Sequence, residues 1–203
     1  MSQHPVPVVD SAATGRFGLS LALAAVVPPL VLAGIGLVHP MELSAATAEM
    51  WRDMHIVLLP LFPLLALGPW LVVRRSAPRL AWITALLGYV YAAFYSALDV
   101  LAGIGAGGLQ LGGYDGVGTL YRLGDALALP GTIALLLASL LASVVAIRRD
   151  GWVAAIGGVL VVVASVSYLT SHIFAPRGVL TMVAFAVGWA VLLVGPQVMR
   201  RGR

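Results

Sequence analysis

Long apolar runs, separated by short polar segments, make up most of this chain. A helix needs roughly 20 apolar residues to cross the hydrocarbon core of a bilayer, and the sequence supplies a run of that length six times. The pattern predicts an all-α integral membrane protein with six transmembrane helices in one bundle. The predicted spans are residues 17–38, 54–73, 79–104, 120–147, 152–171 and 179–199. They form one polytopic domain over residues 17–199, between a disordered N-terminal tail of residues 1–16 and a basic C-terminal tail of residues 200–203.

The composition excludes an ordinary soluble domain. Hydrophobic residues make up 61% of the chain and charged residues 10%, whereas about a quarter of the residues in a soluble domain are charged. The absence of lysine excludes Schiff-base chemistry, and the absence of cysteine excludes thiolate metal sites, iron–sulfur clusters and covalently attached haem. The net charge of +4 comes from arginines in short clusters, a pattern typical of membrane orientation. We therefore expect the lipid bilayer as a partner and no nucleic acid.

The distribution of arginine predicts the orientation in the membrane. With six spans, nine of the twelve arginines fall on one side of the bilayer and three on the other. Positive residues favour the cytoplasmic side, so we expect both termini in the cytoplasm and the protein in the plasma or inner membrane of the cell. The nine arginines on the predicted cytoplasmic side are Arg16, Arg74, Arg75, Arg79, Arg148, Arg149, Arg200, Arg201 and Arg203.

The two longest connections, residues 39–53 and 105–119, both fall on the predicted outer side. In the first, Ser44 is a candidate N-cap, so the second helix is expected to begin near Ala45 and to project beyond the membrane. The second connection is rich in glycine, which predicts a mobile lid or a loop held by its neighbours. Functional groups are therefore expected on the outer side, because long loops carry function more often than short turns do.

Ionisable side chains from five predicted spans fall at one depth, the outer boundary of the membrane. At about 1.5 Å of rise per residue, His39, Asp99 and His172 each lie roughly 20 residues beyond the inner start of their spans. His55 and Asp125 belong to the first turns of spans that begin outside, so they reach the same level. This convergence predicts a ligand or metal site centred on His55, Asp99 and His172. The supporting residues are His39, Tyr95, Ser96, Asp125, Arg122 and Arg177.

A helical stripe along the third span supports this site. Asp99 belongs to the polar outer part of the stripe, and a charged carboxylate in a membrane helix costs up to about 2.5–3.5 kcal/mol at the bilayer centre. We therefore expect a partner for Asp99, namely Arg122, Arg177, a histidine or a bound cation. The residues of the stripe are Gly88, Ala92, Tyr95, Ser96, Asp99 and Gly103, which share one face at helical spacing.

Each of these groups also has a simpler interpretation. His39 precedes Pro40 and is also consistent with a helix end in the head-group zone. Asp125 fits a first-turn acid that the helix dipole favours, and Arg122 and Arg177 fit interfacial anchors. Equal depth alone does not decide between a shared site and separate helix ends.

The residue types of the cluster indicate the chemistry that it supports. Imidazole and carboxylate groups suit Zn²⁺, Fe or Cu, and two facing imidazoles suit a b-type haem. The sequence also fits a small transporter or channel, a non-catalytic subunit or assembly factor of a larger membrane complex, and an enzyme acting on a lipid or quinone head group. No hydrolase, zincin or NTPase motif is present, so no catalytic residue is assigned.

The predicted orientation is testable by cysteine labelling, because the chain contains no cysteine of its own. Single variants Ala46→Cys and Gln110→Cys are expected to react with a membrane-impermeant thiol reagent added to intact cells. Ser76→Cys is expected to react only after the membrane is permeabilised. The reverse labelling pattern would contradict both the orientation and an outward-facing site.

Overall fold

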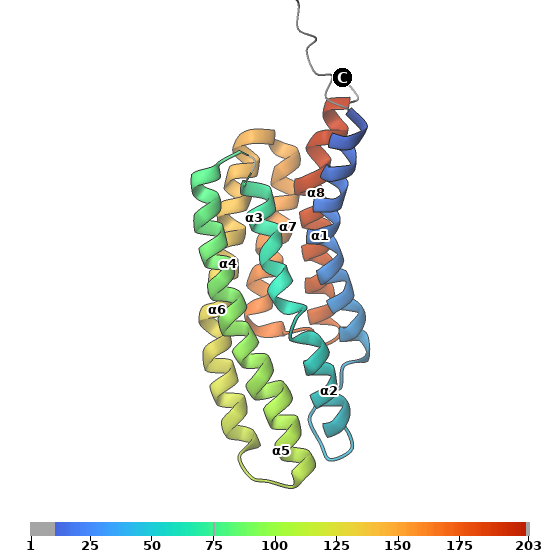
Figure 1. Ribbon diagram of the computed structural model, residues 1–203, viewed down its shortest axis with the longest axis vertical. Coiled ribbons are helices and arrows are strands. Elements are labelled where there is room, and N and C mark those ends of the chain that lie inside the picture. The colour runs from blue at the N-terminus through green and yellow to red at the C-terminus, as the bar shows by residue number, and fades with distance from the viewer. Residues whose placement is uncertain (1–10, 75, 202–203) are drawn as a thin grey trace, which may run out of the picture.

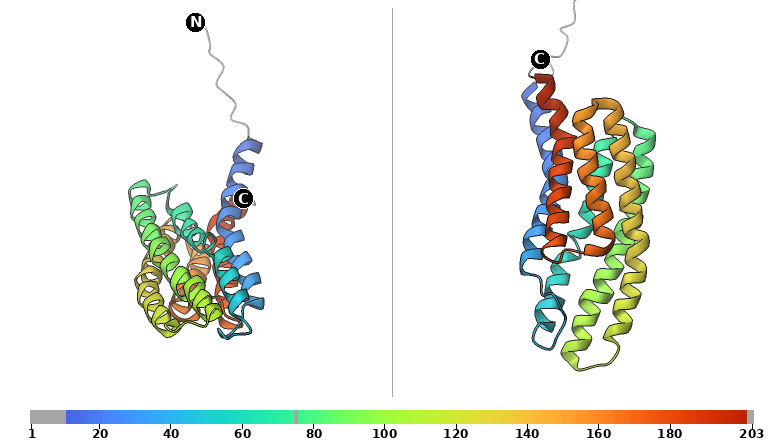
Figure 2. Two further views of the ribbon diagram at one scale, coloured as in Figure 1. Left: turned by 60° about the horizontal axis from the view of Figure 1, so that its bottom comes forward. Right: turned by 180° about the vertical axis from the view of Figure 1, so that it is seen from behind.

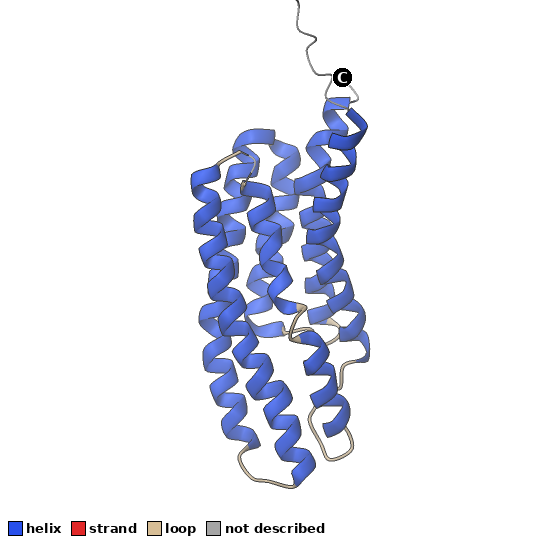
Figure 3. Cartoon of the chain, viewed as in Figure 1, coloured by secondary structure: helices blue, strands red, loops and turns tan. Residues whose placement is uncertain are grey.

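The computed structural model describes residues 11–74 and 76–201, and the side chains of residues 20–74 and 76–195. All regular structure in these ranges is helical (Figure 3). Six helical spans are long and apolar enough to cross a membrane, which confirms the predicted all-α bundle. The first helix begins at Ser11, so residues 11–16 of the predicted disordered tail are helical, whereas residues 1–10 lie outside the described residues.

The six spans are built from ten helical segments, which Figure 1 shows in chain order. The last of them reaches Arg201, so only residues 202–203 of the predicted basic tail lie outside the description. The segments are α1 (Ser11–Val38), α2 (Ala48–Leu58), η1 (Phe62–Ala66), α3 (Leu67–Val73), α4 (Pro78–Leu98), η2 (Asp99–Gly105), α5 (Ala106–Gly112), α6 (Val117–Asp150), α7 (Trp152–Ser171) and α8 (Arg177–Arg201).

The helices pack mainly in a chain of neighbours, with α1 on α8, α8 on α7, α7 on α6 and α6 on α4. The second span, α2–η1–α3, packs against several of these helices, and α2 also contacts η2 and α5. At one end of the bundle, α2, α5 and the start of α6 continue beyond the turn that joins α7 to α8 (Figures 1 and 2). We call this end of the bundle the extended end.

Prolines divide the second span into three segments. The helix α2 ends at Leu58, and a 3₁₀ segment over Phe62–Ala66 follows before α3 continues the span. Pro60 and Pro63 lack the backbone N–H that a continuous helix needs, and their rings crowd the preceding turn. The interruption at these prolines therefore allows α2 to take a direction different from that of α3.

The structure corrects two expectations about the long connections. The helix α2 begins at Ala48 with Thr47 as its N-cap residue, because Ser44 forms a turn with Thr47 instead of capping a helix. The glycine-rich connection over 105–119 is not mainly a loop, since η2 and α5 extend the third span as far as Gly112. Glycine serves close packing here: a Cβ at Gly107 would lie 2.9 Å from the Cβ of Arg52.

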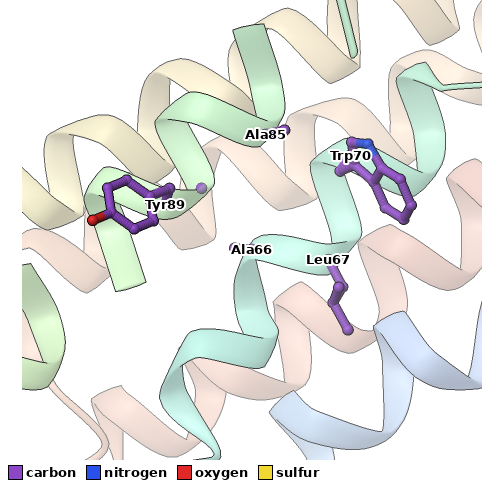
Figure 4. Close-up of a pocket in the computed structure, with 6 residues that line it drawn as sticks. Ala66, Leu67, Trp70, Ala85 and Tyr89 are labelled. Atoms are coloured by element: carbon purple, nitrogen blue, oxygen red, sulfur yellow. The ribbon is translucent and has the colours of Figure 1, made fainter. Parts of the chain in front are cut away.

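A small apolar hollow separates α3 from part of α4 (Figure 4). It has a volume of about 280 Å³, and Trp70 and Tyr89 stand at its sides. Gly88 allows α4 to approach η1 closely, since a Cβ at this position would lie 3.0 Å from the Cβ of Ala66. Its lining contains neither histidine nor carboxylate, so it offers no metal ligand.

Gly68 marks the closest approach of the second span to α8. A methyl group there would overlap the buried ring of Trp189, so Gly68→Ala is expected to destabilise the fold by about 1–3 kcal/mol through overpacking. Gly34→Ala is the matched control, because a Cβ at Gly34 meets no atom within 4 Å. Reversible unfolding of the full chain in mixed micelles measures both. Equal stabilities of the two variants would contradict this packing.

Candidate functional site

Three histidines from distant parts of the chain meet in one cluster. His39 follows α1, His55 lies in α2, and His172 follows α7. Each offers one ring nitrogen, and these three atoms lie within 4.8 Å of one another. The ring centroids of His39 and His55 are 5.1 Å apart, and the centroid of His172 is 5.9 Å and 6.0 Å from them. The three histidines, which the sequence predicts at one depth, therefore also share a position in the fold.

The orientations of His39 and His55 are fixed by backbone carbonyls. Nδ1 of His39 lies 2.7 Å from the carbonyl oxygen of Pro40, and Nδ1 of His55 lies 2.7 Å from that of Trp51. A carbonyl oxygen only accepts hydrogen bonds, so each Nδ1 must carry the proton. The lone pair of each neutral ring is then on Nε2, which is the atom that a metal ion would bind.

Tyr95 orients the third histidine. Its hydroxyl group and Nδ1 of His172 share a hydrogen bond of 2.6 Å. When the Nδ1–H group donates to the phenol oxygen, Nε2 of His172 is left as an acceptor like those of the other two rings. Tyr95 is 2% exposed and stacks on Tyr168 at 5.0 Å between ring centroids, so its hydroxyl group is held in place by packing.

The turn that presents His172 is conformationally unusual. His172 ends α7 with φ of 45°, in the left-handed region that residues other than glycine seldom adopt. The following residue, Ile173, is fully buried and enclosed by two glycines. A Cβ at Gly36 or at Gly178 would overlap the backbone of Ile173. This close packing holds the backbone that aims the imidazole at the cluster.

Asp99 is the fourth ionisable group of the cluster. It is fully buried, and neither carboxylate oxygen has a hydrogen-bond partner among the described residues. One of these oxygens, Oδ1, lies 4.0 Å from Nε2 of His55. The arginine partners expected from the sequence are engaged elsewhere: Arg122 donates to Thr119 at 3.1 Å, and Arg177 donates to Ser167 at 3.3 Å.

Unsatisfied buried atoms concentrate in this cluster. Buried polar groups in native proteins nearly always have a partner, so a concentration of exceptions in one place calls for an explanation, such as a bound water or ion. Among the described side chains, three of the four such atoms belong to His39 and Asp99, and the fourth belongs to Ser139. The three cluster atoms are Nε2 of His39 and both oxygens of Asp99.

Asp99 and His55 are brought together by a π-helical segment. The segment η2 begins at Asp99, and π-helical turns occur frequently at functional sites. The indole N–H of Trp51 in α2 donates to the carbonyl oxygen of Ala102 in η2 at 3.0 Å. A Cβ at Gly103 would overlap the ring of His55, so this glycine gives the imidazole its space. The contact between α2 and η2 thus builds one half of the site.

Aromatic rings enclose the histidines. The rings of Trp51 and Phe174 lie 5.0 Å and 4.8 Å from that of His39, and Phe62 lies 5.2 Å from His172. This apolar surface lowers the local polarity around His39, His55 and one side of His172, which strengthens electrostatic interactions inside the cluster.

Burial favours the neutral form of the two histidines that lie outside the helical spans. Burial lowers the pKa of His39 below its usual value, and the hydrogen bond with Pro40 raises the pKa by less than burial lowers it. Burial also lowers the pKa of His172 well below its usual value, and the imidazoles of His55 and His39 lower it further. Neutral imidazole is the form that binds metal ions, so both rings are ready to ligate at neutral pH.

The other candidates from the sequence lie outside the cluster. Asp125, Arg122 and Arg177 share its depth but are exposed. Ser96 is only half-buried and, in the described part of the chain, forms no hydrogen bond to the histidines. The sequence pattern places Trp51 among the aromatic residues of the membrane boundary and does not connect Trp51, Phe174 or the π-helical segment with the site. Only Gly103, as a member of the helical stripe, indicates the contact between the third span and α2.

Comparison with known proteins assigns no family. No protein family, curated protein or solved structure matches this chain. The function must therefore be inferred from the residues of the chain itself.

The Trp51 hydrogen bond provides a test of the site's scaffold. Trp51→Phe keeps an aromatic ring but leaves the buried carbonyl of Ala102 without its donor, which is expected to lower the free energy of unfolding by about 1–3 kcal/mol. Trp82→Phe is the matched control, because Trp82 is 80% exposed, and its effect is expected to stay within about 0.5 kcal/mol. Unfolding in mixed micelles compares the two, and similar losses would argue against the hydrogen bond.

Proposed function

We propose that this chain is a multi-pass membrane protein that binds one divalent transition-metal ion at the extended end of its bundle. His39, His55 and His172 supply imidazole ligands, and Asp99 supplies a carboxylate. The observation that carries the proposal is the concentration of unsatisfied buried atoms on His39 and Asp99, beside two further imidazoles. A cation at the centre of the cluster would satisfy the carboxylate and the nitrogen lone pairs together.

The donor set favours a transition metal over calcium or magnesium. Imidazole suits Zn²⁺, Cu²⁺, Fe²⁺ and Ni²⁺, whereas Ca²⁺ and Mg²⁺ prefer oxygen ligands only. Four nitrogen and oxygen donors also match the tetrahedral coordination of Zn²⁺. Bonds of about 2.0–2.1 Å place tetrahedral ligands roughly 3.4 Å apart. One ring nitrogen of each histidine lies within 4.8 Å of those of the other two, and Oδ1 of Asp99 lies 4.0 Å from Nε2 of His55, so side-chain rotations would close the site.

The arrangement supports an ion better than a haem. A haem between His55 and His172 needs space for its planar macrocycle between their nitrogens. The ring of His39 lies 5.1 Å and 5.9 Å from these two rings, and Phe174 lies 5.1 Å from His172. These side chains occupy the surroundings that a macrocycle would need.

We infer that the site faces the outer side of the plasma or inner membrane, with both termini in the cytoplasm. The excess of arginine near the opposite end of the bundle supports this orientation. The helix α7 has 20 residues, about 30 Å of rise, which matches the hydrocarbon thickness, and His172 directly follows it. The third and fourth spans, with 35 and 34 residues, then extend beyond the outer boundary.

The distribution of buried polar groups supports a resident ion over a transported one. Transport across the membrane usually requires ionisable groups near mid-depth. In the described part of the chain, the buried ionisable residues other than tyrosine are His39, His55 and Asp99, all in the cluster. The side chain of Asp150 is also only 3% exposed, but it pairs with Arg149 at the far end of α6 and not at mid-depth. The remaining buried polar residues along the spans are serines and threonines.

Metal titration of the purified full-length protein in detergent tests this function. We expect one Zn²⁺ per chain by elemental analysis and calorimetry. His55→Ala and Asp99→Asn are each expected to weaken binding by at least about 10–100-fold, the loss typical of groups that only support a ligand. Asp115→Asn is the matched control for Asp99→Asn, because it removes the same charge from an exposed position outside the cluster.

The free energy of unfolding of each variant without metal distinguishes a structural defect from the loss of a ligand. A variant that is as stable as the metal-free wild type but binds the metal more weakly has lost a ligand. If the wild-type protein and Asp99→Asn have equal affinities for each of Zn²⁺, Cu²⁺, Fe²⁺ and Ni²⁺, the proposed metal site is contradicted.

A further inference from the structure

A cavity connects the surface with one member of the histidine cluster. It has a volume of about 430 Å³ and lies among α4, α6 and the end of α7. Its lining includes the buried Tyr95, the half-buried His172 and the exposed Asp125. Ser171 and Thr170 add hydroxyl groups to an otherwise apolar wall. Asp125, which equal depth placed in the predicted site, therefore lies at the approach to the cluster and not in it.

Access to the cluster is unequal among its four members. The side chains of His55 and Asp99 are 3% and 0% exposed, and His39 is 5% exposed as a residue. His172 is only half-buried, and it is the one cluster residue in the lining of this cavity. Trp51 and Phe174 lie against His39. An incoming ion therefore meets His172 before it meets the other ligands.

We propose that this cavity is the vestibule through which a hydrated divalent cation enters the metal site. Asp125 attracts the cation electrostatically, and His172 is the first ligand that it reaches. This inference rests on the metal-binding function proposed above, and it adds the route of entry and the residue that controls the rate of entry. Entry from the outer side follows if the orientation proposed above is correct.

The charge of Asp125 is available for this role. Within the described residues Asp125 belongs to none of the ion pairs, which join Arg52 to Glu49 and Asp53, His55 to Asp99, and Arg149 to Asp150. Its neighbour Arg122 donates instead to Thr119. A carboxylate without a cationic partner at the mouth of a cavity raises the local concentration of cations and their rate of association.

The steering charge and the width of the route can be changed separately. Asp125→Asn removes the charge with little change of shape at an exposed position, and Asp115→Asn removes a charge from the same end of the protein, away from the cavity lining. Ala128→Phe places a large side chain in the cavity wall without altering a ligand. All three variants are compared with the wild-type full chain in the same detergent.

Stopped-flow mixing with Zn²⁺ and a competing chromophoric chelator measures association and dissociation rates. We expect Asp125→Asn to slow association about 3- to 10-fold at low ionic strength, with a smaller effect at high salt because exposed charges are screened. Asp115→Asn is expected to associate at the wild-type rate. Ala128→Phe is expected to slow association and dissociation by similar factors, which leaves the dissociation constant near that of the wild type.

The outcomes distinguish the route from the site. Equal association rates of Zn²⁺ with the wild type and with Asp125→Asn would overturn the vestibule and leave the metal site standing. The same conclusion would follow if Asp115→Asn slowed association as much as Asp125→Asn does. Absence of Zn²⁺ binding to the wild type would overturn the proposed function itself. If Ala128→Phe does not fold, the comparison of Asp125→Asn with Asp115→Asn decides.

Discussion

The burial of the Asp99 carboxylate is the constraint on which the rest of the site depends. A carboxylate removed from water without a partner is strongly disfavoured, and the arginines at the same depth make contacts elsewhere. What lies beside Asp99 instead is one imidazole of the histidine cluster, His55, whose Nε2 is 4.0 Å from Oδ1. Neutral imidazoles do not balance a negative charge by themselves. A cation shared among the nitrogen and oxygen atoms, as we propose, would balance it and also use the lone pairs that the backbone contacts leave free.

The scaffold around this group combines a helix irregularity with close packing. The π-helical turns of η2 place Asp99 beside α2, and the Trp51 side chain satisfies a carbonyl within those turns. Gly103 lets the His55 ring approach the backbone of η2. The break at Pro60 and Pro63 separates α2 from α3, so α2 can pack against η2 while α3 stays within the bundle. Each feature weakens a regular helix locally, and together they hold ligands from different helices at short range.

The unequal lengths of the helices decide which part of the site is accessible from the surface. The helix α7 stops at Ser171, whereas α6 and the third span continue past it (Figure 2). This step leaves the cavity beside His172, while aromatic rings lie against His39. The result is a buried cluster with one member near a route to the surface. A fully enclosed site would bind an ion only when the bundle opens, and a site open on all sides would lose the apolar surroundings that strengthen binding.

The sequence by itself determined the six spans and the common depth of His39, His55, Asp99 and His172. Both follow from local, additive quantities: the length of each apolar run and the fixed rise per residue of a helix. Depth is only one coordinate, and the direction of each side chain around its helix axis depends on how the helices pack. Asp125 and Arg122 therefore share the depth of the cluster and yet lie outside it. The glycine-rich segment after Gly105 formed a helix and not a loop, and Gly107 within it packs against Arg52 of α2 at close range. Only the tertiary structure decided which histidine nitrogens are free and which carboxylate lacks a partner, since both depend on backbone carbonyls and side chains contributed by other parts of the chain.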